Sequence, residues 1–436
     1  MVAVGRGSLA NNTTANNNTA VGDNALNDNT TGSQNTAVGT NSSDATTTGT
    51  ENTALGYAAL GDNTTGGYNV ALGSRALDAT STASNNVAVG YDALGATTTG
   101  YNNTALGTSA LSYNTTGNLN TAVGGASLAR NTTAGSNTAV GYGAAFETTT
   151  GSINTAIGYY SLYANTVGQY NTGLGAESLR TNTTGNHNVA VGYYALYANT
   201  TGASNTAVGN NALDANTTAD GNTAVGNNAL GANTTGNNNT AVGAFSLDAC
   251  TTGIENTAVG QTAMTGLTTG QYNTAVGQAA ARDLSTGESN TCVGINAGLN
   301  LSTGDNNTLL GTNAGRSSSP SGVVNDESNI VCLGNNAVTS LFCADTSISS
   351  SDSRDKTDVT SFNIGLDWIK ALRPVTYRWD RRTWYGTDEQ PYGTPDGSKK
   401  WDKLHIGFLA QEALEVEKTN GYGSSKDDML IVNLNE

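Results

Sequence analysis

The chain has 436 residues, of which 55 are glycine, 36% are hydrophobic and only 12% are charged. Its 34 acidic and 18 basic side chains give a net charge of −16, which excludes a nucleic-acid binder with a basic face. The scarcity of large apolar residues argues against an ordinary multidomain enzyme of this length. No run of 18 apolar residues or N-terminal signal is present, so the sequence predicts no membrane span.

Two regions of different composition meet near residue 350. All seven lysines lie at or after Lys356, and all four tryptophans also follow the boundary. The first region holds 6 basic and 19 acidic side chains, and the second holds 12 and 15. We predict a repeat shaft over residues 1–316, a degenerate repeat and linker over 317–350, and a separate C-terminal domain over 351–436.

The first region is built from a seventeen-residue internal repeat. Glycine recurs at every seventeenth position from Gly5 to Gly311, giving nineteen copies without insertion or deletion. An Asn stands four residues before each of these glycines from the second copy on. A typical copy, residues 222–238, reads N-T-A-V-G-N-N-A-L-G-A-N-T-T-G-N-N. We expect a degenerate twentieth copy to end at Gly334.

This period predicts a mainly β fold, a parallel β-solenoid. Helical repeats need long stretches of 3.6-residue periodicity, which the motif lacks, and its density of Asn, Thr and Gly disfavours helix. The T-A-V and Leu segments are short, apolar or β-branched, and bounded by Gly or Asn, as expected for strands of a few residues. Coils stacked about 4.8 Å apart predict a rod of roughly 85 Å.

We predict a thin core for this rod. It consists of one Val, Leu or Ile directly before each repeated glycine, as in Val21, Leu55 and Ile157, and a Leu four residues after it, as in Leu26 and Leu60. The Asn column is expected to form a ladder of side-chain amides, pointing inward or capping a corner. Such a narrow core favours lateral association of several chains.

Few residues of the shaft suggest ligand chemistry. Thr pairs such as Thr30-Thr31 suit a glycan-binding or ice-binding face, but they also suit strands and turns. Asp residues occupy no fixed repeat position, so no calcium site is predicted. The cysteines lack C-x-x-C spacing and the only histidines are His187 and His405, so no metal or cofactor is expected. Cys250 and Cys292 are predicted to be small buried thiols.

Both regions resemble known families. The N-T-A-V-G-x-x-A-L pattern over residues 1–315 resembles the head repeats of trimeric autotransporter adhesins, and also stalk repeats of phage tail-fibre-like proteins. From residue 351 the chain reads S-D-S-R-D-K-T-D-V, then I-K-A-L-R-P-V-T-Y-R-W-D, then H-I-G-F-L-A-Q-E-A-L. These blocks, in this order, resemble the C-terminal intramolecular chaperone domain of endosialidases and other phage tail fibres and spikes.

The second resemblance implies a self-cleaving trimerisation domain with a Ser-Lys dyad. Ser351 would be the nucleophile and Lys356 the general base, because a hydroxyl needs a group that removes its proton. The scissile bond would join Ser351 to either Ser350 or Asp352. Ser350 and Ser353 are alternative nucleophiles.

Two features depart from that family. Asp355 occupies a position that is usually apolar, and a carboxylate beside Lys356 would raise the pKa of the lysine and oppose its role as a base. The chain also stops at Glu436, where the family usually continues into a helical segment. We therefore expect the C-terminal domain to be truncated. The chain begins with Met1 inside a repeat, so both ends are expected to be cropped.

The C-terminal domain is predicted to be small and of α+β type. The expected elements are a helix over 362–372 ended by Pro374, a strand over 375–379, a turn-rich insert over 384–403, a strand over 405–409 and a helix over 410–418. His405 is expected to be structural. Gln411 and Glu412 are expected to make polar contacts that support the fold.

The sequence thus predicts a trimeric fibre. The resemblance implies a viral tail fibre or spike in the virion, which binds a host-surface glycan or protein receptor and other tail proteins. The first alternative is a bacterial surface adhesin, and the second is a polysaccharide-degrading tailspike. The only catalysis expected is one turnover of serine autoproteolysis, and the shaft itself is not expected to be an enzyme.

Overall fold

The computed structural model of the chain describes residues 1–340, 371–378, 394–399, 405–408 and 410–419. The chain divides into two compact units, Met1–Leu341 and Phe342–Glu436. None of the helices among these residues combines the length and apolar character that a membrane crossing requires.

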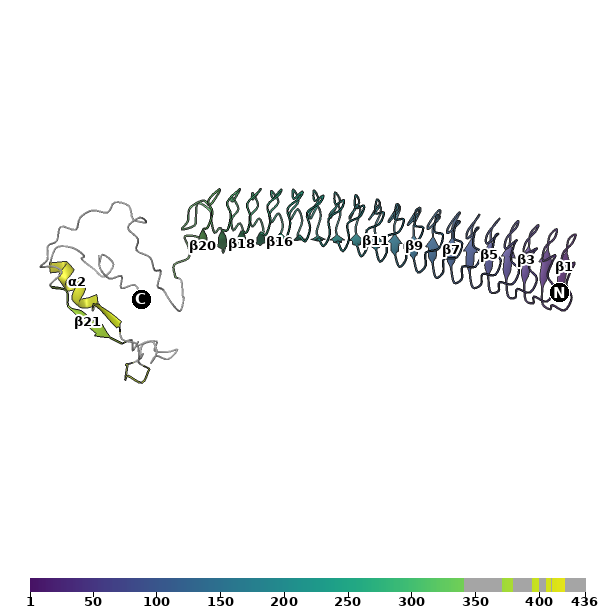
Figure 1. Ribbon diagram of the computed structural model, residues 1–436, viewed down its shortest axis with the longest axis horizontal. Coiled ribbons are helices and arrows are strands. Elements are labelled where there is room, and N and C mark those ends of the chain that lie inside the picture. The colour runs from purple at the N-terminus through teal and green to yellow at the C-terminus, as the bar shows by residue number, and fades with distance from the viewer. Residues whose placement is uncertain (341–370, 379–393, 400–404, 409, 420–436) are drawn as a thin grey trace. The chain divides into compact units, whose positions relative to one another are not determined.

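The first unit is a parallel β-solenoid. Twenty strands of three residues, from β1 (Val2–Val4) to β20 (Val331–Leu333), form one sheet along the shaft (Figure 1). The intervening strands are β2 (Thr19–Val21), β3 (Thr36–Val38), β4 (Thr53–Leu55), β5 (Val70–Leu72), β6 (Val87–Val89), β7 (Thr104–Leu106), β8 (Thr121–Val123), β9 (Thr138–Val140), β10 (Thr155–Ile157), β11 (Thr172–Leu174), β12 (Val189–Val191), β13 (Thr206–Val208), β14 (Thr223–Val225), β15 (Thr240–Val242), β16 (Thr257–Val259), β17 (Thr274–Val276), β18 (Thr291–Val293) and β19 (Thr308–Leu310).

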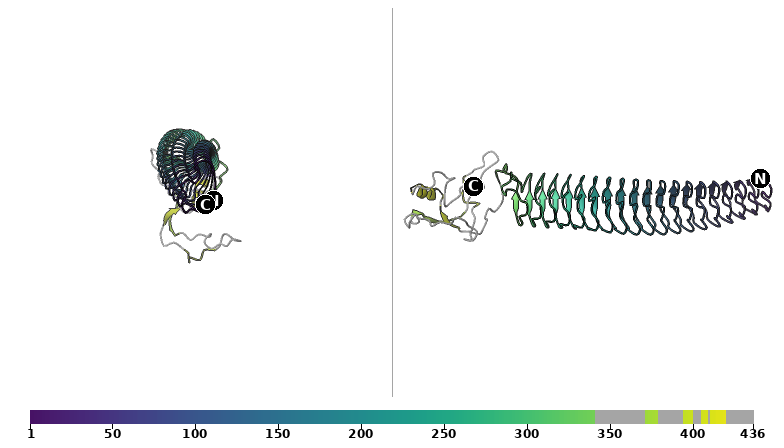
Figure 2. Two further views of the ribbon diagram at one scale, coloured as in Figure 1. Left: turned by 90° about the vertical axis from the view of Figure 1, so that its right-hand side faces the viewer. Right: turned by 90° about the horizontal axis from the view of Figure 1, so that it is seen from above.

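Each strand pairs with the equivalent strand of the next coil. In the middle of the shaft Thr206 lies beside Thr223, which is the same position of the following repeat. The last pairing joins Thr308 of β19 to Val331 of β20, so the last coil, which connects these two strands, is longer than the others. Seen end-on, the coils overlie one another with a gradual turn (Figure 2). The predicted solenoid and its period are therefore confirmed.

The repeated glycine, here called the corner glycine, ends each strand. At Gly209 the φ angle is +143°, in the region that disfavours residues with a side chain. A Cβ atom there would lie 2.3 Å from the carbonyl oxygen of Gly226 in the next coil. The positive φ angle, combined with this close approach of the backbones, explains why glycine stands at this corner in every copy.

Other corners of the coil use residues that are not glycine. In the coil that begins near residue 187, His187, Tyr194 and Leu196 all have φ between +52° and +57°. Left-handed backbone costs about 1–2 kcal/mol at such residues. Leu196 is completely buried, so hydrophobic burial offsets this cost at the leucine.

The core is narrower than predicted, because one of the two columns that were expected inside the shaft lies on its surface. The Leu column, which includes Leu26 and Leu60, is fully buried as predicted. We also expected Val21, Leu55 and Ile157 in the core, and this prediction is wrong: Leu55 is 49% and Ile157 is 36% exposed. Successive side chains of a strand point to opposite faces. The middle residue, which is alanine in sixteen of the twenty strands, points inward in every strand after β1, so its neighbours point outward.

The Asn column points inward and binds both neighbouring coils. The backbone N–H of Asn188 donates to Oδ1 of Asn171 (3.0 Å), and Nδ2 of Asn188 donates to the carbonyl oxygen of Gly202 (2.8 Å). Oδ1 of Asn188 in turn accepts from the backbone N–H of Asn205 (3.0 Å). The expected ladder is confirmed, and its amides replace water as partners for buried backbone groups.

The second unit contains three described elements. Strand β21 (Pro374–Tyr377) pairs in antiparallel fashion with β22 (His405–Phe408), and helix α2 (Ala410–Thr419) follows. These elements match the predicted strands and second helix to within two residues at their ends. The predicted helix over 362–372 and the insert over 384–403 lie largely outside the described residues.

Candidate functional site

A row of aliphatic side chains runs the length of the shaft on the outward face of the sheet. We call the residues directly before the corner glycines the outer column. None of the twenty is buried, whereas the middle residue is buried in nineteen of the twenty strands. The outer column consists of Val4, Val21, Val38, Leu55, Leu72, Val89, Leu106, Val123, Val140, Ile157, Leu174, Val191, Val208, Val225, Val242, Val259, Val276, Val293, Leu310 and Leu333.

The area of this face is that of a protein–protein interface. Twenty strands spaced about 4.8 Å apart span about 90 Å, and three residues at about 3.3 Å each give a width of about 10 Å. The product is roughly 900 Å², close to the 800 Å² that each partner contributes to a standard interface. The outer column supplies about half of this face, and the first residues of the strands, which are Thr in fifteen of the twenty, supply the other half. Soluble monomers rarely expose an unbroken row of aliphatic side chains of this length.

The Thr pairs occupy two different environments. The first threonine holds neighbouring coils together, as Oγ1 of Thr30 donates to the carbonyl oxygen of Thr47 (3.1 Å). The second, such as Thr31, is exposed. A pair therefore presents only one hydroxyl to solvent, and the other supports the stack.

Aromatic residues gather on three of four successive coils near the middle of the shaft. Tyr142 and Tyr159 stack with ring centroids 6.1 Å apart and planes 16° apart, and Tyr159 lies 4.1 Å from Tyr160. Two coils further on, Tyr193 and Tyr194 lie 4.0 Å apart. We call this cluster the tyrosine platform; it consists of Tyr142, Tyr159, Tyr160, Tyr163, Tyr193, Tyr194 and Tyr197.

Arg180 connects the two halves of the platform. Its guanidinium carbon lies 5.5 Å from the ring centroid of Tyr160 and 5.7 Å from that of Tyr197. One guanidinium nitrogen donates to Oε2 of Glu177 (2.7 Å) and to the hydroxyl of Tyr197 (3.2 Å). Cation–π contacts and an ion pair thus fix the arginine in one position while a third of its side chain stays exposed.

Two cysteines of the shaft, Cys250 and Cys292, are unreactive because of their environment. Cys250 and Cys292 are fully buried, as predicted, and burial raises the pKa of Cys250 to about 11 and that of Cys292 to about 12. Cys250 stands seven residues after a corner glycine, where many coils have Asn, and Cys292 stands in the alanine column. Over the described ranges no three His, Cys, Asp or Glu side chains lie together as metal ligands.

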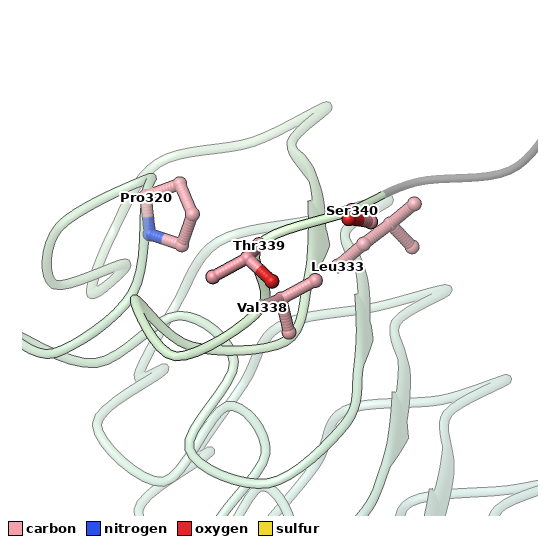
Figure 3. Close-up of a pocket in the computed structure, with 5 residues that line it drawn as sticks. All are labelled: Pro320, Leu333, Val338, Thr339 and Ser340. Carbon is pink, nitrogen blue, oxygen red and sulfur yellow. The ribbon is translucent and has the colours of Figure 1, made fainter.

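The C-terminal end of the shaft has a shallow hollow of about 290 Å³. It lies beside β20, between Pro320 of the longer last coil and the segment that follows Leu333 (Figure 3). Val338, Thr339 and Ser340 complete its lining. The hollow is thus formed by the extra residues of the last coil and by the segment that leaves β20.

The described part of the C-terminal unit is held by an ion pair. Nε of Arg373 donates to Oε2 of Glu412 (2.9 Å), and the second guanidinium nitrogen contacts Oε1. The guanidinium holds the pKa of Glu412 below its usual value. Glu412 thus joins the start of α2 to the residue before β21, which agrees with its predicted supporting role.

The predicted catalytic residues lie outside the described part of the chain. These are Ser351 and Lys356, with the bonds from Ser350 to Asp352 and the alternative nucleophile Ser353. Their roles remain predictions from the sequence.

Comparison with known proteins identifies the C-terminal domain. Residues 351–422 match the peptidase S74 family, described as the chaperone of endosialidase. No curated protein matches the chain. The protein therefore carries a chaperone-of-endosialidase domain after a β-solenoid shaft.

Sequence reasoning did not find the outer column or the tyrosine platform as surfaces. A signal for the first was present, because the middle residue of the strand is almost always Ala while the outer residue varies among Val, Leu and Ile. A stacked interior column needs a constant volume, so the variable position is the one that faces outward. The sequence also held a signal for the tyrosine platform, because Tyr directly follows three of four successive corner glycines.

Proposed function

We propose that the protein is the subunit of a trimeric fibre, in which the chaperone domain aligns three chains and the shafts associate through their outer columns. The outer column carries this proposal. It is an uninterrupted row of aliphatic side chains on a face of standard interface size, in a chain whose C-terminal residues match the chaperone-of-endosialidase family.

The geometry of the shaft suits association of parallel chains. Every coil presents a Val, Leu or Ile at the same position, so parallel shafts in register bring equal residues opposite one another. Burial of such a side chain contributes about 1.5–3 kcal/mol relative to full exposure. Even a fraction of that value, summed over twenty coils, exceeds the cost of association.

The biological role that fits this assembly is attachment of a virus particle to its host. We propose a phage tail fibre or tailspike located in the virion, with a host-surface molecule as receptor and other tail proteins at its base. The chaperone-of-endosialidase domain supports this assignment. The acidic, elongated shaft is consistent with an extracellular structural protein.

The assembly is tested with charges placed in the outer column. The complete chain with both Val208→Asp and Val225→Asp is compared with the parent by analytical ultracentrifugation. We expect the parent to sediment as a trimer and the variant as smaller species, because buried, unpaired carboxylates are costly. Thr218→Asp is the matched control at an exposed position outside the strands, and it should remain trimeric. A parent that sediments as a stable monomer contradicts the proposal.

We further propose that the chaperone domain is released by autoproteolysis. Neutral Nζ of Lys356 accepts the hydroxyl proton of Ser351, whose Oγ forms a bond to the carbonyl carbon of Ser350. The bond from that carbon to the nitrogen of Ser351 breaks, and this nitrogen receives the proton from Lys356. Water then hydrolyses the resulting ester, which regenerates the Ser351 hydroxyl and leaves two chains.

Expression of the complete gene beside Ser351→Ala tests this step. The parent should give a shorter chain on denaturing gels, with a mass that locates the cut beside Ser351, and the variant should give only the full-length chain. Ser353→Ala serves as the control and should still be cut. Full-length chain from both the parent and the control contradicts autoproteolysis, although the trimer proposal is unaffected.

A further inference from the structure

The tyrosine platform is a local feature of an otherwise uniform shaft. The positions one and two residues after the corner glycine differ from coil to coil, and most coils have Asn, Ala, Ser, Thr or Gln there. Two adjacent tyrosines occupy these positions only after Gly158 and Gly192. An interface between shafts has to repeat in every coil, so the platform fits a different kind of partner, one that contacts four coils.

The chemistry of the platform combines uncovered aromatic surface with fixed polar groups. Tyr142 is 55%, Tyr159 50% and Tyr193 46% exposed. The 6.1 Å between the centroids of Tyr142 and Tyr159 exceeds the coil spacing of about 4.8 Å, so the stacked rings are offset and part of each face stays uncovered. Arg180 and Glu177 lie between the halves as an anchored donor and acceptor.

We propose that the tyrosine platform is a binding site for a neutral oligosaccharide or polysaccharide. Pyranose rings have apolar C–H faces that pack on tyrosine rings, while their hydroxyls hydrogen-bond to Arg180, Glu177 and the tyrosine hydroxyls. The inference rests on the proposed role in host attachment and names the chemical class of the receptor.

The charge of the region selects neutral saccharides over acidic ones. Both arginines of the region are paired with carboxylates, Arg180 with Glu177 and Arg130 with Glu147, each at 2.7 Å. No net positive charge remains there to attract a polyanion, and the whole chain has a net charge of −16. An acidic glycan or a nucleic acid would be repelled by this background.

The test uses the complete protein on a printed array of neutral and acidic bacterial surface polysaccharides, together with dextran, mannan and chitohexaose. The variant combines Tyr159→Ala with Tyr193→Ala. Alanine occurs naturally at this position in other coils, as at Ala176 and Ala244, so the fold accommodates it. The matched control is Tyr57→Ala, which removes an equally exposed tyrosine directly after a corner glycine outside the platform.

We expect the parent and Tyr57→Ala to bind at least one neutral saccharide, and the double variant to lose at least tenfold in affinity by titration calorimetry with that saccharide. Binding to no saccharide of the array, preference for acidic ones, or equal affinity of the double variant overturns the proposal. So does a double variant that fails to form the parent's trimer in sedimentation, because the platform would then be a chain–chain interface. Binding by a parent that is monomeric overturns the proposed assembly and leaves the saccharide site standing.

Discussion

Substitution of one corner glycine provides the sharpest test of the solenoid. In Gly209→Ala the new Cβ atom would lie 2.3 Å from the carbonyl oxygen of Gly226, and the backbone would keep a φ of +143°. The conformational cost of such a φ is about 1–3 kcal/mol. Relief of the contact requires the two coils to separate by about 1 Å, the difference from an ordinary van der Waals contact.

Separation of the coils also stretches hydrogen bonds between the strands. The N–H of Gly209 donates to the carbonyl oxygen of Val191 and that of Gly226 to Val208, both at 2.8 Å. Each such bond contributes about 0.5–1.5 kcal/mol net. Together with the strain, we expect Gly209→Ala to lower the free energy of unfolding by about 3 kcal/mol or more.

The control is Gly202→Ala, at a second glycine of the coil. Its Cβ would lie 2.4 Å from the carbonyl oxygen of Ala219, almost as close as at Gly209. However, its φ is outside the left-handed region, and four coils have alanine at the equivalent position. These are Ala15, Ala83, Ala134 and Ala219. The coil therefore adjusts there, and we expect a loss below about 1 kcal/mol.

Urea unfolding and hydrogen exchange of the complete protein distinguish the two outcomes. Each coil contacts only its neighbours, so faster exchange in Gly209→Ala should be confined to coils next to residue 209, with coils near residue 60 unchanged. Equal destabilisation by the two substitutions would refute the reasoning, because it would show that close contact and not backbone conformation requires the corner glycine.

Four further outcomes are expected. Burial raises the pKa of Asp248, so the charged carboxylate opposes folding at pH values above that pKa, and this penalty disappears as the pH falls. We therefore expect Asp248→Asn to raise the urea midpoint of unfolding at pH 7 but not at pH 3. Asn188→Ala should cost several kcal/mol in urea unfolding, because it leaves buried backbone groups without partners. In a chain whose Cys343 is replaced by serine, iodoacetamide should modify Cys250 only after unfolding, as mass spectrometry would show. Asp355→Leu should shift the pH profile of self-cleavage to lower pH, because the general base would lose an adjacent carboxylate.

The solenoid was predictable because its repeat has no insertion over nineteen copies. A fixed period, a corner glycine and a column of Asn impose the same environment on every copy, so one copy determines the rest. The Leu column at Leu26 and Leu60 was identified because a large aliphatic residue occurs there in most coils. The burial of Cys250 and Cys292 followed from the columns in which they stand.

The direction of the strand side chains was not predicted. A three-residue strand with Ala in the middle and Val after it is apolar on both faces, so size alone placed Val21 inside. The interior mostly holds alanine at that level, beside the inward Leu of the same coil. The tyrosine platform also escaped prediction, because its residues form a cluster only after four coils are stacked.

The repeat that makes the shaft predictable also makes its assembly ambiguous. In the proposed fibre, shafts that slip by one coil would still oppose Val, Leu and Ile of the outer columns and would lose only one of twenty layers of contact. That layer is worth a few kcal/mol, small beside the total and slow to correct once a long interface has formed. The coils cannot select their own register, so a part of the chain that does not repeat has to do so. The last coil, which is longer than the others, and the chaperone domain after it are the non-repeating parts at that end. The proposed fibre, aligned from its C-terminal end, would extend in register from the first contact, which would explain why a chaperone domain follows so regular a shaft.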